Sequence, residues 1–252
     1  FNGFDINYHP KLWLNLSNLY SYLLNFEKSL EYLKKAEEKT LEVLGPKAIS
    51  LMTIYDGIAN NLIQYNQMNL AFEYYNKALE VAEYNQNVSE EKKITLLINM
   101  GMAYTRIGKI DEANKIDKKL LSSITNFNST TFLERYQTFK LDLLISSRDY
   151  KEARKLAEKY INDMVKLYSA NSYKIFDAYD RIRGAWGSVQ QNEEIIYWSE
   201  KALNYYNLVL NGQDEKIIMD LNTSLAYGYG ASWYKNTEDI NIDAYLSDDE
   251  IP

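Results

Sequence analysis

The chain of 252 residues carries 28 basic and 35 acidic side chains, and six of the acids lie in the stretch 236–252, which contains no base. The body before that acidic end is nearly neutral, which argues against a nucleic-acid-binding protein, because such proteins present a basic surface. No cysteine is present, which excludes disulfides, zinc–thiolate sites and cysteine nucleophiles, and no apolar run approaches the roughly 20 residues that cross a bilayer.

Glycine and proline are scarce, with 10 and 3 residues respectively, which is few for a strand-rich fold with many tight turns. We therefore predict an all-α protein. The first residue is Phe1 rather than methionine, so we expect the chain to be a processed or an excised piece of a protein.

Small residues recur along the chain with a regular period of 42. The first series is Ser17, Ala59 and Gly101. A second series lies twelve positions further on in each unit and comprises Ser29, Ala71 and Ala113. Steps of 40 and then 42 extend the two series to Leu141 with Ala153 and to Arg183 with Ile195. The spacing predicts five similar units.

Each unit is predicted to hold two antiparallel amphipathic helices joined by a short polar turn. Large apolar residues flank the first small position at offsets that place them on one helix face, as in Trp13, Leu16 and Tyr20. Small side chains allow the two helices to cross closely. In the third unit, Gly101 is expected at that crossing and Gly108 at the end of the first helix, where glycine is favoured. Capping boxes are predicted at Thr131 with Glu134 and at Asp149 with Glu152.

This pattern resembles the tetratricopeptide repeat (TPR) family. The family motif has an aromatic residue, leucine, a small residue and tyrosine on the first helix, which Trp13–Leu16–Ser17–Tyr20 matches. Its second helix has alanine, an aromatic residue and alanine, which Ala71–Tyr75–Ala78 matches. The period of 42 and the turns in "YHPKLWLNLSNLY" and "LEVLGPKAIS" are similar to the long repeats of the kinesin-light-chain type. The resemblance implies an all-α, right-handed α-α superhelical solenoid of about five helix hairpins plus a C-terminal capping helix.

The predicted domain organisation follows from this repeat. Residues 1–9 are a lead-in, residues 10–231 are the solenoid, and residues 232–252 are an acidic tail or linker. Within the solenoid, the repeats are expected at about 10–45, 46–87, 88–126, 127–169 and 170–211, with the capping helix at 213–231.

The sequence offers little catalytic chemistry. No phosphate-binding glycine motif and no Gly-x-Ser-x-Gly nucleophile elbow occurs, and His9 is the sole histidine. A metal site would have to rest on carboxylates alone, and the acidic stretch "DAYLSDDE" lacks the spacing of a calcium loop. We therefore predict a protein that is not an enzyme and has no cofactor and no metal.

The resemblance implies that the first helices line a concave groove that binds a protein or an extended peptide. The candidate groove residues are Asn15, Asn18, Asp56, Asn60, Asn99, Arg106, Arg135, Asp142, Asp177 and Asp180. Asn18 and Asn60 hold equivalent places in consecutive repeats, either to bind a peptide backbone or simply as polar residues of an asparagine-rich surface. A clamp for a C-terminal carboxylate, known in some TPR domains, is not expected, because its basic positions hold Leu14, Ile98 and Met102.

Two alternatives to a free-standing binding scaffold remain open. In the first, the chain is a regulatory segment of a larger bacterial enzyme, such as a caspase-like protease or a sensor kinase. In the second, it is a receptor for a signalling peptide. In the first case its partners include other domains of the longer parent chain. The acidic end, residues 236–252, is either a flexible linker or a segment that folds back onto Arg106 and Arg135.

Overall fold

The computed structural model describes residues 8–124, 130–169 and 171–237. Every regular element in these ranges is helical, so the all-α prediction is confirmed. Within the same ranges, no helix combines the length and the apolar character that crossing a membrane requires. The acidic end beyond Thr237 and the side chain of Thr131 lie outside the description, so the fold-back hypothesis and the first capping box are not addressed.

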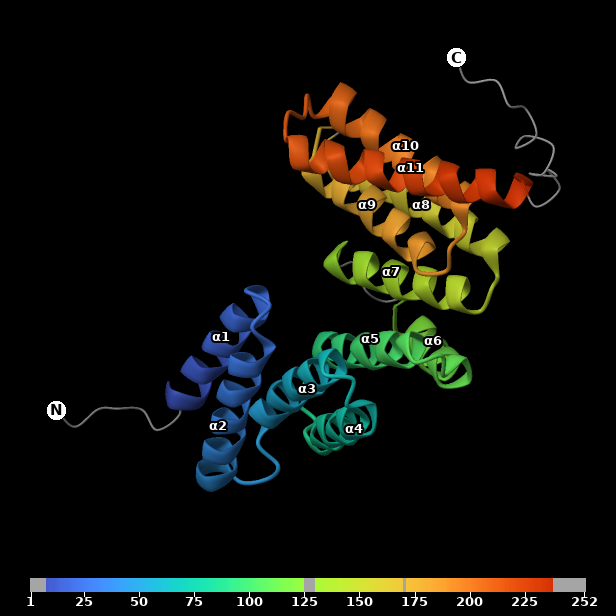
Figure 1. Ribbon diagram of the computed structural model, residues 1–252. Helices are drawn as coiled ribbons and strands as arrows, with labels where there is room; N and C mark the ends of the chain where they lie inside the picture. The colour runs from blue at the N-terminus through green and yellow to red at the C-terminus, as the bar shows by residue number, and fades with distance from the viewer. Residues whose placement is uncertain (1–7, 125–129, 170, 238–252) are drawn as a thin grey trace, which may run out of the picture. The chain divides into compact units, whose positions relative to one another are not determined.

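The helices form successive antiparallel pairs followed by one unpaired helix (Figure 1). The first helices of the pairs are α1 (Tyr8–Tyr22), α3 (Ile49–Gln64), α5 (Glu90–Arg106), α7 (Thr130–Ser146) and α9 (Tyr173–Gly187). The second helices are α2 (Phe26–Leu44), α4 (Met68–Tyr84), α6 (Ile110–Ile124), α8 (Tyr150–Leu167) and α10 (Asn192–Asn204), the last extended by a π turn, η1 (Tyr205–Val209). The final helix is α11 (Glu215–Thr237), whereas the sequence placed a capping helix at 213–231.

One turn geometry ends all five first helices. The turn residue has a positive φ, between +56° and +73°, and it is Leu24, Asn66, Gly108, Arg148 or Gln190. The amide of the following residue donates to the carbonyl five positions earlier, for example Lys109 N to Tyr104 O at 2.9 Å. This is the Schellman arrangement, which satisfies the last carbonyls of a helix. The sequence predicted Gly108 at the end of the first helix of the third unit, and the structure places it in the turn that ends α5.

The chain divides into two compact units, residues 1–135 and 136–252, and the boundary falls within α7. In the first unit, consecutive helices from α1 to α6 pack against one another. The small positions lie at the helix contacts as predicted: the hydroxyls of Ser17 and Ser29 are hydrogen-bonded at 2.9 Å, and Ala59 and Ala71 are fully buried.

The second unit has its own apolar core, built from α7 to α10 around Trp186 and Trp198, which are both fully buried. A smaller cluster centred on Tyr206 joins α9, α10 and α11. At α8 the N-cap half of the predicted capping box is present, because Asp149 Oδ1 accepts from the amide of Glu152 at 3.4 Å. The amide of Asp149 donates to Leu144 O, and Glu152 Oε1 accepts from Lys155 Nζ. At Gly228, an added Cβ would come within 2.7 Å of Ile196, so α11 approaches α10 closely there.

Candidate functional site

Four polar side chains of the first unit are linked by hydrogen bonds, and we call them the polar row: Asp56 and Asn60 of α3, Asn99 of α5, and Arg135 near the start of α7. Asn99 Nδ2 donates to both carboxylate oxygens of Asp56, at 2.9 and 3.0 Å. Arg135 Nη2 donates to Asn99 Oδ1 at 2.5 Å. The amide of Asn99 therefore links an acid to a base across neighbouring helices, and all four residues of the row were candidates from the sequence.

Asn60 is held from within the protein. Its Nδ2 donates to the backbone carbonyl of Asp56 at 2.8 Å and to Asp56 Oδ1 at 3.2 Å. Its Oδ1 accepts from the hydroxyl of Tyr75, a fully buried side chain of α4, at 2.9 Å. Because both ends of the Asn60 amide have partners here, Asn60 orients Asp56 in this arrangement.

Sequence reasoning assigned Tyr75 to packing only and missed this role. The repeat motif has an aromatic residue at that position. The spacing does not distinguish a phenylalanine from a tyrosine whose hydroxyl forms a hydrogen bond with a polar side chain.

Burial sets the electrostatics of the polar row. It raises the pKa of Asp56 from 3.8 to about 6, against the opposing effects of the Asn99 hydrogen bonds, the Arg135 charge and the Asn60 hydrogen bond. Burial also raises the pKa of Tyr75 well above its ordinary value. At neutral pH, Asp56 is therefore mostly ionised and Tyr75 keeps its proton. The row presents a partly buried negative charge, Asp56, and a partly buried positive charge, Arg135, linked through the amide of Asn99.

The remaining candidates of the first unit lie apart from the polar row. Asn15 and Asn18 are exposed on α1. Arg106 is exposed at the end of α5, where its Nη1 lies 3.4 Å from Gln64 Oε1 at the end of α3.

Three acidic candidates belong to the second unit. Burial raises the pKa of Asp142 on α7 to about 6, and the positive charge of Arg181 on α9 opposes that shift. Asp177 is exposed on α9. Asp180, one turn further along α9, accepts from Arg183 Nε at 3.0 Å and from Arg183 Nη2 at 2.5 Å.

Arg183 joins α9 to α11. Its Nη2 also lies 2.7 Å from Asp220 Oδ2, and its Nη1 donates to the hydroxyl of Ser224. The sequence placed Arg183 in the series of small residues, where a close helix contact was expected. Its long, partly buried side chain instead reaches the next helix and pairs with acids on both.

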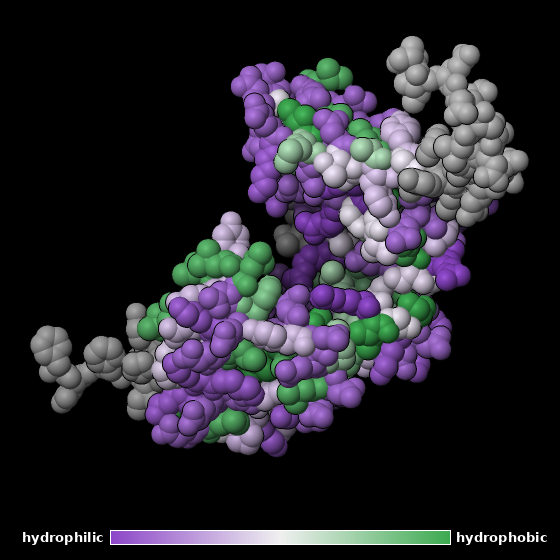
Figure 2. All heavy atoms as spheres, viewed as in Figure 1, coloured by the Kyte–Doolittle hydropathy of each residue, from purple (hydrophilic) through white to green (hydrophobic). Residues whose placement is uncertain are grey.

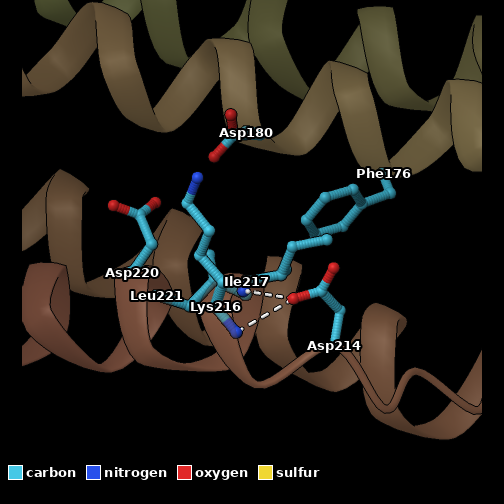
Figure 3. A pocket seen from close by; sticks show the side chains of 7 residues that line it. All are labelled: Phe176, Asp180, Asp214, Lys216, Ile217, Asp220 and Leu221. Carbon is cyan, nitrogen blue, oxygen red and sulfur yellow. Dashed lines mark hydrogen bonds between the residues drawn. The ribbon is translucent and has the colours of Figure 1, made fainter.

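A pocket of about 380 Å³ lies between α9 and α11 (Figure 3). Its lining comprises Phe176, Asp180, Asp214, Lys216, Ile217, Asp220 and Leu221. The acids of the pocket already have partners, since Asp180 and Asp220 bind Arg183. Asp214 Oδ1 accepts from the amides of Lys216 and Ile217, at 2.9 and 3.3 Å, and so caps α11.

Comparisons with known proteins agree with this fold. The sequence model of the tetratricopeptide repeat matches residues 8–83. The crystal structure of a point variant of a putative kinesin light chain with nearly identical TPR-like repeats, from Podosopora anserina, has a TM-score of 0.62 at 13% identity and covers 81% of this chain and 98% of its own. BtubC (BKLC) from P. vanneervenii has a TM-score of 0.60 at 15% identity, covering 90% of this chain and 94% of its own. No curated protein matched. Residues 8–83 match the tetratricopeptide-repeat model, and the stacked hairpins and the structural neighbours show that the chain has an all-α solenoid fold.

Proposed function

We propose that this chain is a non-catalytic scaffold that binds a protein or an extended peptide over the first helices of its first unit. The observation that carries the proposal is the polar row, because it sets an acid and a base across three helices of neighbouring hairpins. In this proposal, the repeats at about 46–87, 88–126 and 127–169 each supply one helix to the binding surface. Tetratricopeptide repeats generally mediate contacts between proteins, which supports the same reading.

The dimensions of the surface suit a short extended segment. Packed helices lie about 8–10 Å apart, and α3 contacts α5, so these two first helices present a row of about 10 Å. An extended peptide advances about 3.3 Å per residue, so roughly three residues span these two helices.

The charges of the row favour one orientation of the ligand. A guanidinium carries five N–H donors and suits a carboxylate or carbonyl group, so Arg135 is the expected partner for an acidic or carbonyl group of the ligand. Asp56 is the expected partner for a donor or a cation at the other end.

A selection experiment tests the proposal. A random peptide library is selected on the full chain, and the enriched peptides are titrated by calorimetry against the wild type, Arg135→Ala and Arg154→Ala. Arg154 is a matched control, because it is an exposed arginine of α8 that pairs with Glu194 at 3.0 Å in the second unit. Circular dichroism establishes that each variant is folded.

We expect peptides with dissociation constants in the micromolar range, weakened about tenfold or more by Arg135→Ala, which corresponds to about 1.4 kcal/mol. Arg154→Ala leaves the affinity unchanged. Equal binding by all three proteins places the ligand elsewhere, and a library that yields no binder contradicts the peptide-binding function itself.

A further inference from the structure

Asp142 of α7 and Arg181 of α9 are an acid and a base on consecutive first helices of the second unit. Their helices pack through one apolar cluster, which contains Leu141 beside Asp142 and Ile182 beside Arg181. Asp142 is partly buried and Arg181 is exposed. The positive charge of Arg181 acts on the pKa of Asp142, so the two groups lie within electrostatic reach of each other.

Both charged groups are open. Within residues 8–124, 130–169 and 171–237, neither the Asp142 carboxylate nor the Arg181 guanidinium forms a side-chain hydrogen bond or an ion pair. A partly buried carboxylate without a donor is unfavourable, because it has lost water and gained no hydrogen bond in exchange. A ligand that supplies a donor to Asp142 removes this deficit.

The repeat explains why Asp142 is left open. Asp142 holds the place in the fourth hairpin that Asn60 holds in the second, and Asn60 accepts a hydrogen bond from the hydroxyl of Tyr75. The residue of the fourth hairpin that corresponds to Tyr75 is Ala157, which is fully buried and has no hydroxyl. The internal partner of this position is therefore missing in the second unit.

The polar row of the first unit shows which chemical group fits between an acid and a base. There the amide of Asn99 donates to both carboxylate oxygens of Asp56, and its oxygen accepts from Arg135. A primary amide makes both contacts because it carries N–H donors and an acceptor oxygen on one carbon. Arg181 holds in α9 the repeat position that Asn99 holds in α5, so the second unit has a base where the first unit has the amide.

The surface around Arg181 is accessible to a polar ligand. Figure 2 shows purple, hydrophilic residues over much of the second unit, including the region of α7 and α9. Gly184, three residues after Arg181 on α9, is exposed, and an added Cβ there would meet no atom within 4 Å. A side chain of a partner can therefore approach this part of α9 closely.

We propose that Asp142 and Arg181 bind a primary amide of a partner protein or peptide, which is the side chain of an asparagine or a glutamine. The N–H groups of the ligand amide donate to Asp142, and its oxygen accepts from Arg181. This site goes beyond the surface proposed on the first unit, because it lies in the second unit and uses no residue of the polar row.

Parallel selections test the proposal. A random peptide library is selected on the full wild-type chain and on the double variant Asp142→Ala, Arg181→Ala. The matched control is Arg154→Ala, Glu158→Ala, which removes a base and an acid of α8 in the same unit that lie 3.7 Å apart. We expect asparagine and glutamine to be enriched in the peptides selected on the wild type and on the control, and not in those selected on the Asp142→Ala, Arg181→Ala variant.

Calorimetry with a pair of peptides then locates the contact. One enriched peptide is synthesised with its amide residue and with leucine in that place. We expect the leucine peptide to bind the wild type and the control about tenfold more weakly or worse. On the Asp142→Ala, Arg181→Ala variant, the two peptides should bind equally. Circular dichroism establishes that the variants are folded.

The inference is overturned if asparagine and glutamine are not enriched on the wild type, or if they are enriched equally on the Asp142→Ala, Arg181→Ala variant. It is also overturned if the leucine peptide loses as much affinity on that variant as on the wild type. Peptides that depend on Arg135 and not on Asp142 contradict this inference alone and leave the function proposed above intact. A library that yields no binder contradicts both.

Discussion

The carboxyl group of Asp56 makes the stability of the first unit depend on pH in an unusual direction. Its pKa rises from 3.8 to about 6 on folding, because burial disfavours the charged form. Between these two values the folded chain binds the proton more tightly than the unfolded chain does. The contribution of Asp56 to stability is therefore most favourable at low pH, and it is lost as the pH rises towards 6.

The size of the effect follows from the shift. One pKa unit corresponds to about 1.36 kcal/mol, so a shift of about two units makes folding less favourable by about 3 kcal/mol at pH 7 than at pH 3. Replacing Asp56 with asparagine removes this dependence and keeps one side-chain oxygen as an acceptor for Asn99. The free energy of unfolding of Asp56→Asn, relative to that of the wild type, should therefore increase by about 3 kcal/mol across this range.

Two measurements check this prediction. Urea titrations at several pH values, followed by circular dichroism, give the difference in unfolding free energy between wild type and variant, with the exposed Asp177→Asn as the matched substitution. Carbon-13 NMR of the carboxyl groups gives the pKa of Asp56 directly, which matters because a chain of two units need not unfold in one step. A pKa near 4, or a difference between wild type and Asp56→Asn that does not change with pH, would refute the reasoning.

Three further substitutions test the helix ends and contacts by urea titration. Gly108→Ala should lower the unfolding free energy by about 1 kcal/mol, because φ is +73° there. Gln190→Gly, at the equivalent turn residue of the fifth hairpin, should raise it by about 0.5 kcal/mol. A more stable Gly108→Ala or a less stable Gln190→Gly would contradict the shared turn geometry. Tyr75→Phe should cost about 1–2 kcal/mol, because it leaves the acceptor of Asn60 without its partner; an unchanged stability would show that water replaces the hydroxyl. Gly101→Leu should cost about 1–3 kcal/mol or more, because Gly101 is buried within α5; a variant as stable as the wild type would show that Gly101 lies at no helix contact.

The sequence predicts the fold well because the repeat is imposed by steric constraints that recur in every hairpin. Two helices that cross closely need small side chains at the crossing, and the Ser17–Ser29 contact and the buried Ala59 and Ala71 lie there. The repeat register and the family resemblance placed Asp56 and Arg135 on the expected groove stripe and Asn99 beside it, and in the structure hydrogen bonds link these three residues.

The parts that the sequence does not predict depend on where a side chain points in the folded protein. The ring of Tyr75 is buried in the core, and its hydroxyl donates a hydrogen bond to Asn60. That bond joins α4 to α3, so it depends on how the two helices pack. Arg183 falls at a position where the repeat calls for a small residue, but its length lets the guanidinium reach Asp220 on α11. In both cases the decisive partner lies on another helix, beyond what spacing along one helix can indicate.

The recurring turns after the first helices also bear on how the chain folds. Each is closed by hydrogen bonds between residues three to five positions apart, for example Asn66 N to Ile63 O at 3.1 Å and Gln67 N to Leu62 O at 2.9 Å. Contacts this local carry a small entropic cost of loop closure and form quickly. Folding can therefore begin at any of the five hairpins and spread to its neighbours, so the route to the native state need not start from one end of the chain.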